Sequence, residues 1–261
     1  MDTLDLRRDG PVAWLTLNRP ASLNALNPAL VDELRAFFAG LADDARTRVV
    51  VLRGAGRAFC AGLDLREPPS GAGGVAAGLR GQRRISEIVQ LMRRAPQPIV
   101  ACLHGPACGG GFALALASDV RIAGESARMN AAFIRLGLSG CDVGVSYFLP
   151  RLVGASLAAE LILTGRFLGA ERARELGLVS RVVPDAELEA AAREIVDEML
   201  ATSPLGLRLS KECLNASLDA ASLEQVIAME DRNQILCAQT PDFGEGVRAF
   251  LEKRPPRWRD A

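Results

Sequence analysis

One stretch, residues 98–119, limits the possible folds of this chain more than any other. Ile99–Leu103 is a short apolar run between a proline and a glycine, which predicts a strand covered on both faces. Gly109–Gly111 carry no side chains, so another backbone segment or a ligand can approach closely. Residues 112–117 have no polar face and predict a buried helix. The stretch predicts either tight packing of a strand against a helix, or a helix N-terminus whose free N–H groups hold a negative charge.

Length and composition predict one large domain, or a domain with an appendage. The 261 residues are 49% hydrophobic, which is enough for a sizeable core. The formal net charge is zero, so the chain has no electrostatic footprint for nucleic acid or a membrane surface. The N-terminus lacks the basic start and apolar core of a signal peptide, and no apolar run approaches the ~18–20 residues of a membrane helix. We expect a soluble cytoplasmic protein.

Cysteine and histidine usage argues against metal binding and against histidine-based catalysis. The six cysteines are scattered without a CxxC pair, so we expect reduced core residues. His104 is the only histidine, it has no metal-ligand spacing, and it follows a predicted buried strand, which favours a structural role. No metal site is therefore predicted. The cysteines are Cys60, Cys102, Cys108, Cys141, Cys213 and Cys237.

The pattern of predicted elements changes near Leu188. Before that residue strands and helices alternate, and after it the pattern is only helical. This order predicts an α/β core with a helical tail. Because the tail is too short to be a comfortable independent domain, we expect it to pack on a neighbour. Strands are predicted at 12–17, 49–52, 99–103, 119–123 and 177–183.

Local signals predict where several helices begin and end. Asn27 before Pro28 predicts one helix start, and Asp242 is expected to cap the last helix. Residues 68–81 are rich in proline, glycine and alanine with little pattern, so we expect a mobile loop there. A helix is predicted to follow over 82–94.

Six stretches of the sequence occur in an order and at distances typical of one family. They are 17–26 (with Leu-Asn-Arg-Pro and Asn-Ala-Leu), 57–65, 104–111, 163–165, 173–180 and 242–254. Together they resemble the crotonase superfamily, the enoyl-CoA hydratase/isomerase family. The third stretch has His104 where the family usually has asparagine. The resemblance covers nearly the whole chain.

The resemblance implies a fold, an assembly and a substrate class. The implied fold is an α/β crotonase-type ββα spiral core over residues 1–195, followed by a helical trimerisation region over 196–261. Members commonly form a homo-trimer or a dimer of trimers. They bind acyl-CoA thioesters and stabilise an enolate with two backbone N–H groups, which fall at Leu63 and Gly110 here. Coenzyme A is part of the substrate, so no separate cofactor is expected.

The resemblance also implies residues that bind coenzyme A. Backbone at Ala25 and at residues 63–65, which include Asp64 and Leu65, lines the adenine site. Arg66 occupies a position that is often basic and near the phosphates. Phe250 and Lys253 match a pair in the tail that often reaches the coenzyme A of a neighbouring subunit. In the alternative interpretation Lys253 is a solvated charge at a helix end, and Asp64 simply fixes its loop.

The chain departs from the hydratases of the family at two positions. Those enzymes use two glutamates, and the corresponding residues here are Ala113 and Phe133, which cannot move a proton. The nearby carboxyl is Asp142, in a stretch that resembles the dienoyl-CoA isomerases, where the aspartate is an acid/base. Asp142 also aligns with the nucleophile of chlorobenzoyl-CoA dehalogenases. The histidine partner of those dehalogenases falls at Gln90, which argues against dehalogenation.

Asp142 has two compatible interpretations. Partial burial in its apolar neighbourhood would raise its pKa and suit it to proton transfer. It could also cap a helix that begins near Val143. Tyr147 is the only tyrosine. We favour a core position with a satisfied hydroxyl for it over a role as hydrogen-bond donor in the site.

These observations lead to one main hypothesis and two competing ones. The main hypothesis is an acyl-CoA enzyme with a backbone oxyanion hole and one proton-carrying aspartate, for which double-bond isomerisation is easier to account for than hydration. The first alternative is an acyl-CoA-binding oligomer with little or no hydratase activity. The second is a nucleotide-binding protein that uses Gly109–Gly111, but the chain lacks a P-loop ending and a dinucleotide fingerprint.

Overall fold

The computed structural model describes residues 2–67 and 73–259, and within them two sheets are formed. The main sheet has the strand order β1-β2-β3-β4-β6-β9, in which β1 and β2 are antiparallel and all other neighbours are parallel. A second, smaller sheet has the order β5-β7-β8. The strands are β1 (Leu4–Asp9), β2 (Val12–Leu17), β3 (Val49–Gly54), β4 (Ile99–Leu103), β5 (Pro106–Cys108), β6 (Val120–Gly124), β7 (Arg128–Asn130), β8 (Leu168–Gly169) and β9 (Arg181–Val183).

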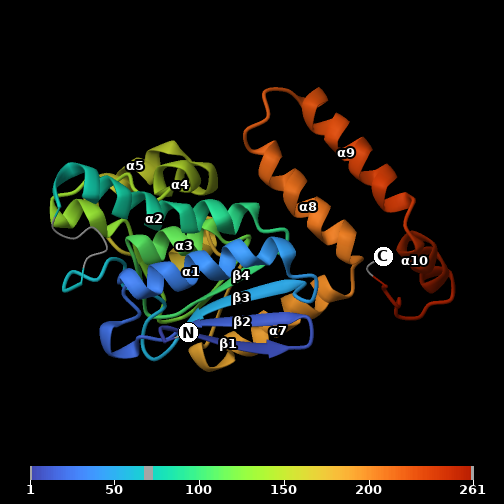
Figure 1. Ribbon diagram of the computed structural model, residues 1–261, viewed down its shortest axis with the longest axis horizontal. Coiled ribbons are helices and arrows are strands. Elements are labelled where there is room, and N and C mark those ends of the chain that lie inside the picture. Colours follow the sequence, from blue (N-terminus) through green and yellow to red (C-terminus); the bar gives the residue numbers. More distant parts are fainter. Residues whose placement is uncertain (1, 68–72, 260–261) are drawn as a thin grey trace.

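Helices cover both faces of the main sheet and continue beyond it (Figure 1). They are α1 (Pro28–Gly40), α2 (Gly74–Arg94), α3 (Gly110–Ala117), α4 (Val145–Val153), α5 (Ala155–Thr164), α6 (Ala170–Glu175), α7 (Leu188–Leu200), α8 (Pro204–Ser217), α9 (Leu223–Ala238) and α10 (Pro241–Leu251). Short 3₁₀ helices lie between them at Pro20–Ser22, Leu41–Asp43, Ala132–Leu136 and Asp185–Glu187.

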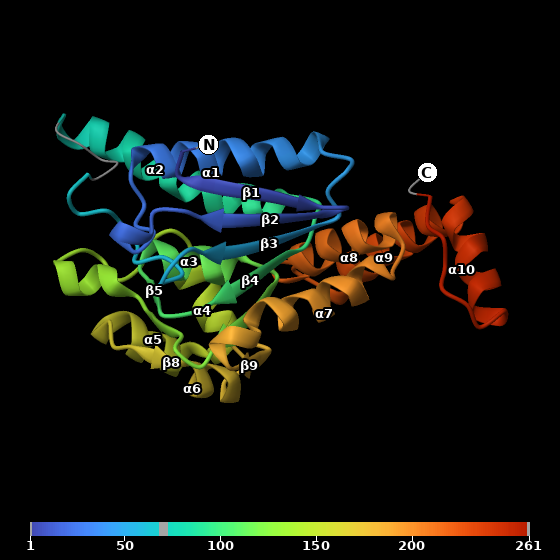
Figure 2. The same cartoon turned by 90° about the horizontal axis from the view of Figure 1, so that it is seen from below.

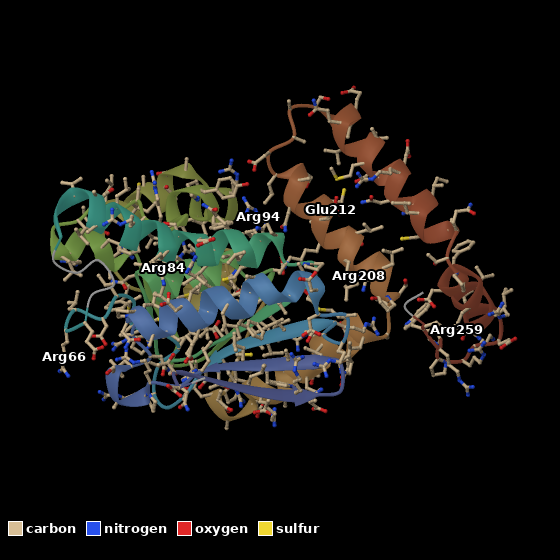
Figure 3. All side chains as sticks on the ribbon, in the orientation of Figure 1. Arg66, Arg84, Arg94, Arg208, Glu212 and Arg259 are labelled. Carbon is tan, nitrogen blue, oxygen red and sulfur yellow. The ribbon has the colours of Figure 1, made fainter. Side chains whose placement is uncertain are left out.

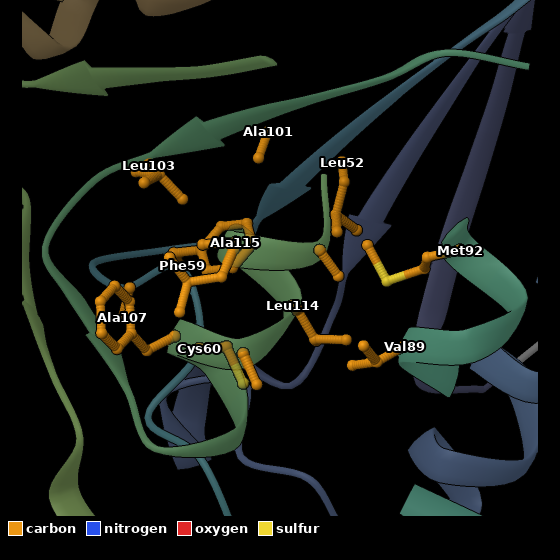
Figure 4. Packing of buried hydrophobic residues seen from close by; sticks show 14 of the residues in the cluster. Leu52, Phe59, Cys60, Val89, Met92, Ala101, Leu103, Ala107, Leu114 and Ala115 are labelled. Atoms are coloured by element: carbon orange, nitrogen blue, oxygen red, sulfur yellow. The ribbon is translucent and has the colours of Figure 1, made fainter. Parts of the chain in front are cut away.

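The central strands are buried on both faces because alternate side chains enter two separate cores. On one face Leu52 joins α1, α2 and α3, and Figure 4 shows it beside Met92 and Leu114. On the other face Trp14 and Val51 pack against α7. This double coverage explains why the strands read as continuous apolar runs in the sequence and holds the ends of β3 and β4 rigidly.

The last three helices, α8–α10, extend away from the sheet as a separate group (Figures 1 and 2). Many of their apolar side chains are exposed in the single chain: Leu214, Leu218, Leu223, Ile227, Ile235, Leu236, Phe243, Val247, Phe250 and Leu251. Exposed apolar area of this extent is typical of an interaction surface. The role of residues 196–261 in oligomerisation remains a prediction.

Several predicted elements match the structure. The five predicted strands correspond to β2, β3, β4, β6 and β9. Asn27 is the N-cap of α1, because its side chain accepts a hydrogen bond from Leu30 N–H at 3.0 Å. Strand β1 was not predicted. It is an edge strand with several charged residues, so it lacks the apolar run by which the other strands were found. The strands of the second sheet are too short to produce a pattern.

Two local predictions are wrong. The mobile loop expected over 68–81 is contradicted at 74–81, because α2 begins at Gly74; residues 68–72 lie outside the described part of the chain. Asp242 does not cap α10. The N-cap is Thr240, and the buried Asp242 instead accepts a hydrogen bond from Arg259 N–H at 2.8 Å. The carboxylate therefore holds the chain end that follows the helix rather than the helix start.

The cysteines and the histidine take no part in a metal cluster among the described residues. Cys60, Cys102 and Cys108 are free and buried as predicted, but Cys141 is exposed and the remaining two are only partly buried, so the expectation of six core cysteines is wrong. The imidazole Nε2 of His104 lies 2.9 Å from Gly56 O, which agrees with a structural role. No helix in the described ranges is long and apolar enough to cross a membrane.

Candidate active site

Two segments that are far apart in the sequence meet at the ends of β3 and β4. The loop after β3 runs beside the glycine turn, because Cys60 N–H donates to Pro106 O at 3.1 Å and Cys108 N–H donates to Cys60 O at 2.9 Å. The glycine turn is thereby fixed against the loop that carries Leu63. The family resemblance implied that these two stretches lie together.

The N–H group of Leu63 is left free by a backbone bridge to Leu26. Leu26 N–H donates to Gly62 O at 2.7 Å, and Leu26 O accepts from Asp64 N–H at 3.0 Å. In a parallel bridge the residue between these two partners points its own N–H to the other side. Leu63 N–H therefore points away from Leu26, and no acceptor for it occurs among the described residues.

A second free N–H belongs to Gly110, the first residue of α3. The first N–H groups of a helix have no acceptor within the helix, and the positive end of the helix dipole lies there. Gly110 is adjacent to the loop, since a Cβ placed on Gly62 would lie 3.4 Å from Gly110 N and 2.7 Å from Cys108 O. Gly62 also has φ +91°, which favours glycine. The missing side chains of Gly62 and Gly110 thus allow the two segments to pack closely and bring Gly110 N–H next to the loop that carries Leu63.

Leu63 and Gly110 line one cavity of about 420 Å³. Its wall is mainly apolar, with Asp142 as the only carboxyl and Arg135 as the only cationic side chain among the described residues that line it. The other lining residues are Leu26, Ala61, Gly62, Leu65, Gln82, Ile85, Cys108, Gly109, Asn130, Ala132, Phe133, Leu136, Leu138, Val143 and Phe167. The cavity has the composition of a small-molecule site, in which a few polar groups converge in an apolar pocket.

The carboxylate of Asp142 is half-buried in the wall of this cavity. Its Oδ1 accepts hydrogen bonds from Gln82 Nε2 at 2.6 Å and from Val143 N–H at 2.8 Å. Burial raises the pKa of Asp142, against a smaller lowering by the Val143 N–H. A half-buried carboxyl with a raised pKa in a cavity is a candidate for proton transfer.

Asp142 does not cap a helix, so that interpretation is wrong. Helix α4 begins at Val145, its N-cap is Gly144, and no side chain caps it. The reason is the backbone between them: Val143 and Gly144 both have positive φ, +47° and +85°, which turns the chain once more before the helix starts. The carboxylate of Asp142 is consequently free to face the cavity.

Asp64 fixes the loop of the candidate site. Its carboxylate forms an ion pair with Arg19 at 2.9 Å and accepts from Arg66 N–H at 3.0 Å, while the same guanidinium donates to Ala25 O. Burial would raise the pKa of Asp64, but these hydrogen bonds outweigh it and hold the pKa below its ordinary value. Ala25 and Asp64 are thus brought together, and their neighbours Leu26, Leu63 and Leu65 line the cavity although these two residues do not.

The predicted coenzyme A residues are not all brought together within one chain. Leu65 lines the cavity and is exposed, and the side chain of Arg66 points into solvent beyond it (Figure 3). Phe250 lies near the end of α10 and is 83% exposed, and Lys253 follows it. Helix α10 lies at the opposite end of the molecule from the N-terminal end of α2 and the loop of Arg66 (Figures 1 and 3).

The two positions of the family's glutamates are occupied by apolar side chains in the structure as well. Ala113 is fully buried in α3. Phe133 lines the cavity, and its ring lies 3.3 Å from where a Cβ of Gly109 would be. Tyr147 is outside the cavity, and its hydroxyl donates to Asp219 Oδ2 at 2.6 Å. Gln82 was not predicted as a site residue, because a single polar residue on a predicted helix gives no signal of its contacts.

Comparison with known proteins shows the family and the fold. Residues 7–261 match the family described as enoyl-CoA hydratase/isomerase. A probable enoyl-CoA hydratase of Mycobacterium leprae is 41% identical over 256 residues, which are 96% of this chain and 87% of that protein. A 1,2-epoxyphenylacetyl-CoA isomerase of Escherichia coli is 36% identical over 249 residues, with 95% and 94% covered. The crystal structure of an enoyl-CoA hydratase from Bacillus anthracis superposes with a TM-score of 0.94 at 36% identity, covering 99% of this chain and 100% of that chain.

This chain belongs to the enoyl-CoA hydratase/isomerase family, within the crotonase superfamily. Its α/β fold is of the crotonase type, as the resemblance implied.

Proposed function

We propose that this protein is an acyl-CoA enzyme of the isomerase type, with the thioester oxygen held by the N–H groups of Leu63 and Gly110. Asp142 carries the proton. The observation behind the proposal is that two free backbone donors and the one lining carboxyl share a single cavity. Such donors stabilise a developing oxyanion, since losing one of them typically costs ~2.7–4 kcal/mol.

The proposed reaction shifts a double bond along the acyl chain. The Asp142 carboxylate takes a proton from the α carbon of a 3-enoyl thioester, and the C–H electron pair forms a dienolate whose oxygen lies between the two N–H groups. The neutral carboxyl then gives the proton to the γ carbon, which leaves a 2-enoyl thioester. One carboxyl with a pKa raised by burial performs both transfers.

Hydration needs more groups than this cavity offers. It requires a base on the attacking water and an acid at the carbon, and Ala113 and Phe133 supply neither. The relatives' names include hydratases and a 1,2-epoxyphenylacetyl-CoA isomerase, so the family accommodates both reaction types. The single carboxyl favours isomerisation here. The alternative is an acyl-CoA-binding oligomer with little or no hydratase activity.

The remaining parts of the proposal concern coenzyme A and assembly. Ala25 and residues 63–66 contact the adenine and phosphates, and no separate cofactor is needed. The distance of α10 from the cavity within one chain favours a role for Phe250 and Lys253 at a neighbouring subunit, in a homo-trimer or a dimer of trimers. The exposed apolar side chains of α8–α10 supply the interface for such an assembly.

The experiment that tests the function offers purified protein 2-enoyl-CoA and 3-enoyl-CoA and follows the products by chromatography. We expect interconversion of the two double-bond isomers and little 3-hydroxyacyl-CoA. Calorimetry with acetyl-CoA, ATP and NAD runs beside it, and only acetyl-CoA is expected to bind. Tight binding without any product would favour the acyl-CoA-binding alternative, and 3-hydroxyacyl-CoA as the main product would establish hydration.

A methyl group on Gly111 tests the coupling between the glycine turn and the donor loop. A Cβ there would lie 2.2 Å from Cys60 O and 2.8 Å from Cys60 C, both backbone atoms. Gly111→Ala is therefore expected to lower the free energy of unfolding by about 1–3 kcal/mol. Because the displaced loop carries Leu63, turnover is expected to fall about 100-fold. Gly40→Ala is the control, since nothing lies within 4 Å of its Cβ and φ is −72°; equal behaviour of the two variants would contradict the coupling.

A further inference from the structure

The two oxygens of the Asp142 carboxylate have different environments. Oδ1 accepts both of the hydrogen bonds that hold the group, from Gln82 Nε2 at 2.6 Å and from Val143 N–H at 2.8 Å. No described residue donates to Oδ2. A carboxylate held at one oxygen by two donors in different directions has a fixed orientation, so Oδ2 is the oxygen left for exchange with a substrate.

We propose that Gln82 is a positioning residue that anchors Asp142 Oδ1, so that Oδ2 is the atom that takes and returns the proton. This inference rests on the proposed role of Asp142. It adds a residue that the family resemblance did not assign. The backbone N–H of Val143 is a single donor to Oδ1, and the Gln82 amide adds a second donor to the same oxygen from α2, which narrows the positions that the carboxylate can take.

The position of Gln82 on α2 suits this role. Ile85, three residues later, lies on the same helix face and lines the same cavity. Arg83 and Arg84, which follow Gln82 directly, are exposed on the outer side of the helix. Gln82 is thus the residue of this turn that faces inward with a polar group. Helix α2 packs on α1 and α3, so its inward face is held against the core.

A neutral donor has an electrostatic advantage at this position. A cation beside a carboxylate lowers its pKa by about 1–3 units, which would weaken the base. An amide orients the group with a smaller effect, so that burial continues to raise the pKa of Asp142. Cys108 and Arg135 are the other titratable side chains among the described residues of the cavity wall, and burial raises the pKa of Cys108 to about 11. Beyond Val143, burial and Asp219 raise the pKa of Tyr147.

The test replaces the donor without shortening the side chain. In Gln82→Met the ionised carboxylate loses a hydrogen bond, so kcat is expected to fall about tenfold with little change in KM. Because the lost bond stabilised the charged form, the acidic limb of the pH–rate profile is expected to move up by about one pH unit. Gln239→Met makes the same change at the exposed C-terminal end of α9, outside the cavity, and is expected to match the wild type. Gln82→Glu retains the shape and is expected to raise the midpoint further.

A direct titration separates this inference from the proposed function. The ¹³C carboxyl resonance of Asp142, assigned by its loss in Asp142→Asn, is expected to titrate at a higher pH in Gln82→Met than in the wild type. A wild-type rate, profile and titration in Gln82→Met would overturn the inference, as would a rise in KM with kcat unchanged. If the titration moves but Asp142→Asn is fully active, the anchor is real and the proposed proton carrier is wrong, which also overturns the catalytic purpose of the anchor.

Discussion

Asp142→Asn is expected to lower turnover of enoyl-CoA at least about 100-fold, the lower end of what a general acid–base group contributes. Asparagine has nearly the same shape, and its Oδ1 still accepts from Gln82 and Val143, so the cavity wall remains intact. The amide neither takes nor returns a proton. Binding of the thioester relies on backbone N–H groups and is expected to stay within a few-fold of the wild type, as calorimetry will measure.

The pH dependence follows from the raised pKa of Asp142, which burial causes. The first step needs the ionised carboxyl, so wild-type kcat/KM is expected to rise with pH through a midpoint above that of an exposed aspartate. The same shift affects stability with the opposite sign. The folded-state pKa exceeds the unfolded one, so the stabilisation is present below the unfolded pKa and is lost as pH rises through the folded pKa. At pH 7 Asp142→Asn is therefore expected to melt at or above the wild-type Tm.

Asp43→Asn is the matched control, because Asp43 is exposed after α1 and lines none of the cavity. It is expected to leave both turnover and the pH profile unchanged. If Asp142→Asn behaves like Asp43→Asn in both assays, Asp142 does not carry the proton. A large drop in Tm for Asp142→Asn would instead assign Asp142 a structural role. The combination of lost turnover with retained stability is what distinguishes a catalytic carboxyl from a structural one.

The backbone part of the candidate site could be predicted from the sequence because its glycines are forced by contact. At Gly62 and Gly111 a Cβ would meet backbone oxygens at 2.7 Å and 2.2 Å, whereas at Gly110 it would meet only the end of the Leu26 side chain, at 2.7 Å. A run of glycines after a buried strand indicates close approach of another segment or a ligand, and the partner stretch at 57–65 was assigned from the family resemblance. The long apolar strands were equally clear, since helices on both faces of the sheet remove any alternation of polar residues.

Side-chain contacts between distant parts of the chain could not be predicted from the sequence. Gln82 and Asp142 are 60 residues apart and meet only because α2 crosses the loop before α4. Nothing in the local sequence distinguishes Gln82 from other polar residues of an amphipathic helix. The local sequence also gives no sign of the turn at Val143, because a β-branched residue at positive φ is uncommon. A helix cap at Asp142 was therefore the ordinary expectation. Tertiary packing decides both.

Lys211→Met is expected to lower the free energy of unfolding by about 3 kcal/mol, the lower end for breaking a buried ion pair, because among the described residues Asp119 then keeps only the more distant guanidinium of Arg93 at 3.6 Å. Lys211 is 5% exposed, and its Nζ lies 2.8 Å from Asp119 Oδ2 while donating to Met92 O at 3.1 Å and Gln97 O at 2.8 Å. Burial lowers the pKa of Lys211, and Asp119 opposes that lowering. One ammonium thus joins α8 to the end of α2 and the start of β4. Urea unfolding at a fixed protein concentration measures the loss.

The chain supplies its own control, since Lys253 is the only other lysine and is exposed. Lys253→Met is expected to change the unfolding free energy by no more than about 0.5 kcal/mol. The double variant Lys211→Met/Asp119→Asn is expected to recover part of the loss, because it removes the carboxylate charge that has lost its nearer cation, while Ile99 N–H, now 2.8 Å from Asp119 Oδ2, keeps an acceptor. If Lys211→Met unfolds like Lys253→Met, the ion pair does not hold α8. If it is destabilised and the double variant recovers nothing, the loss comes from the two carbonyl groups rather than from the charge.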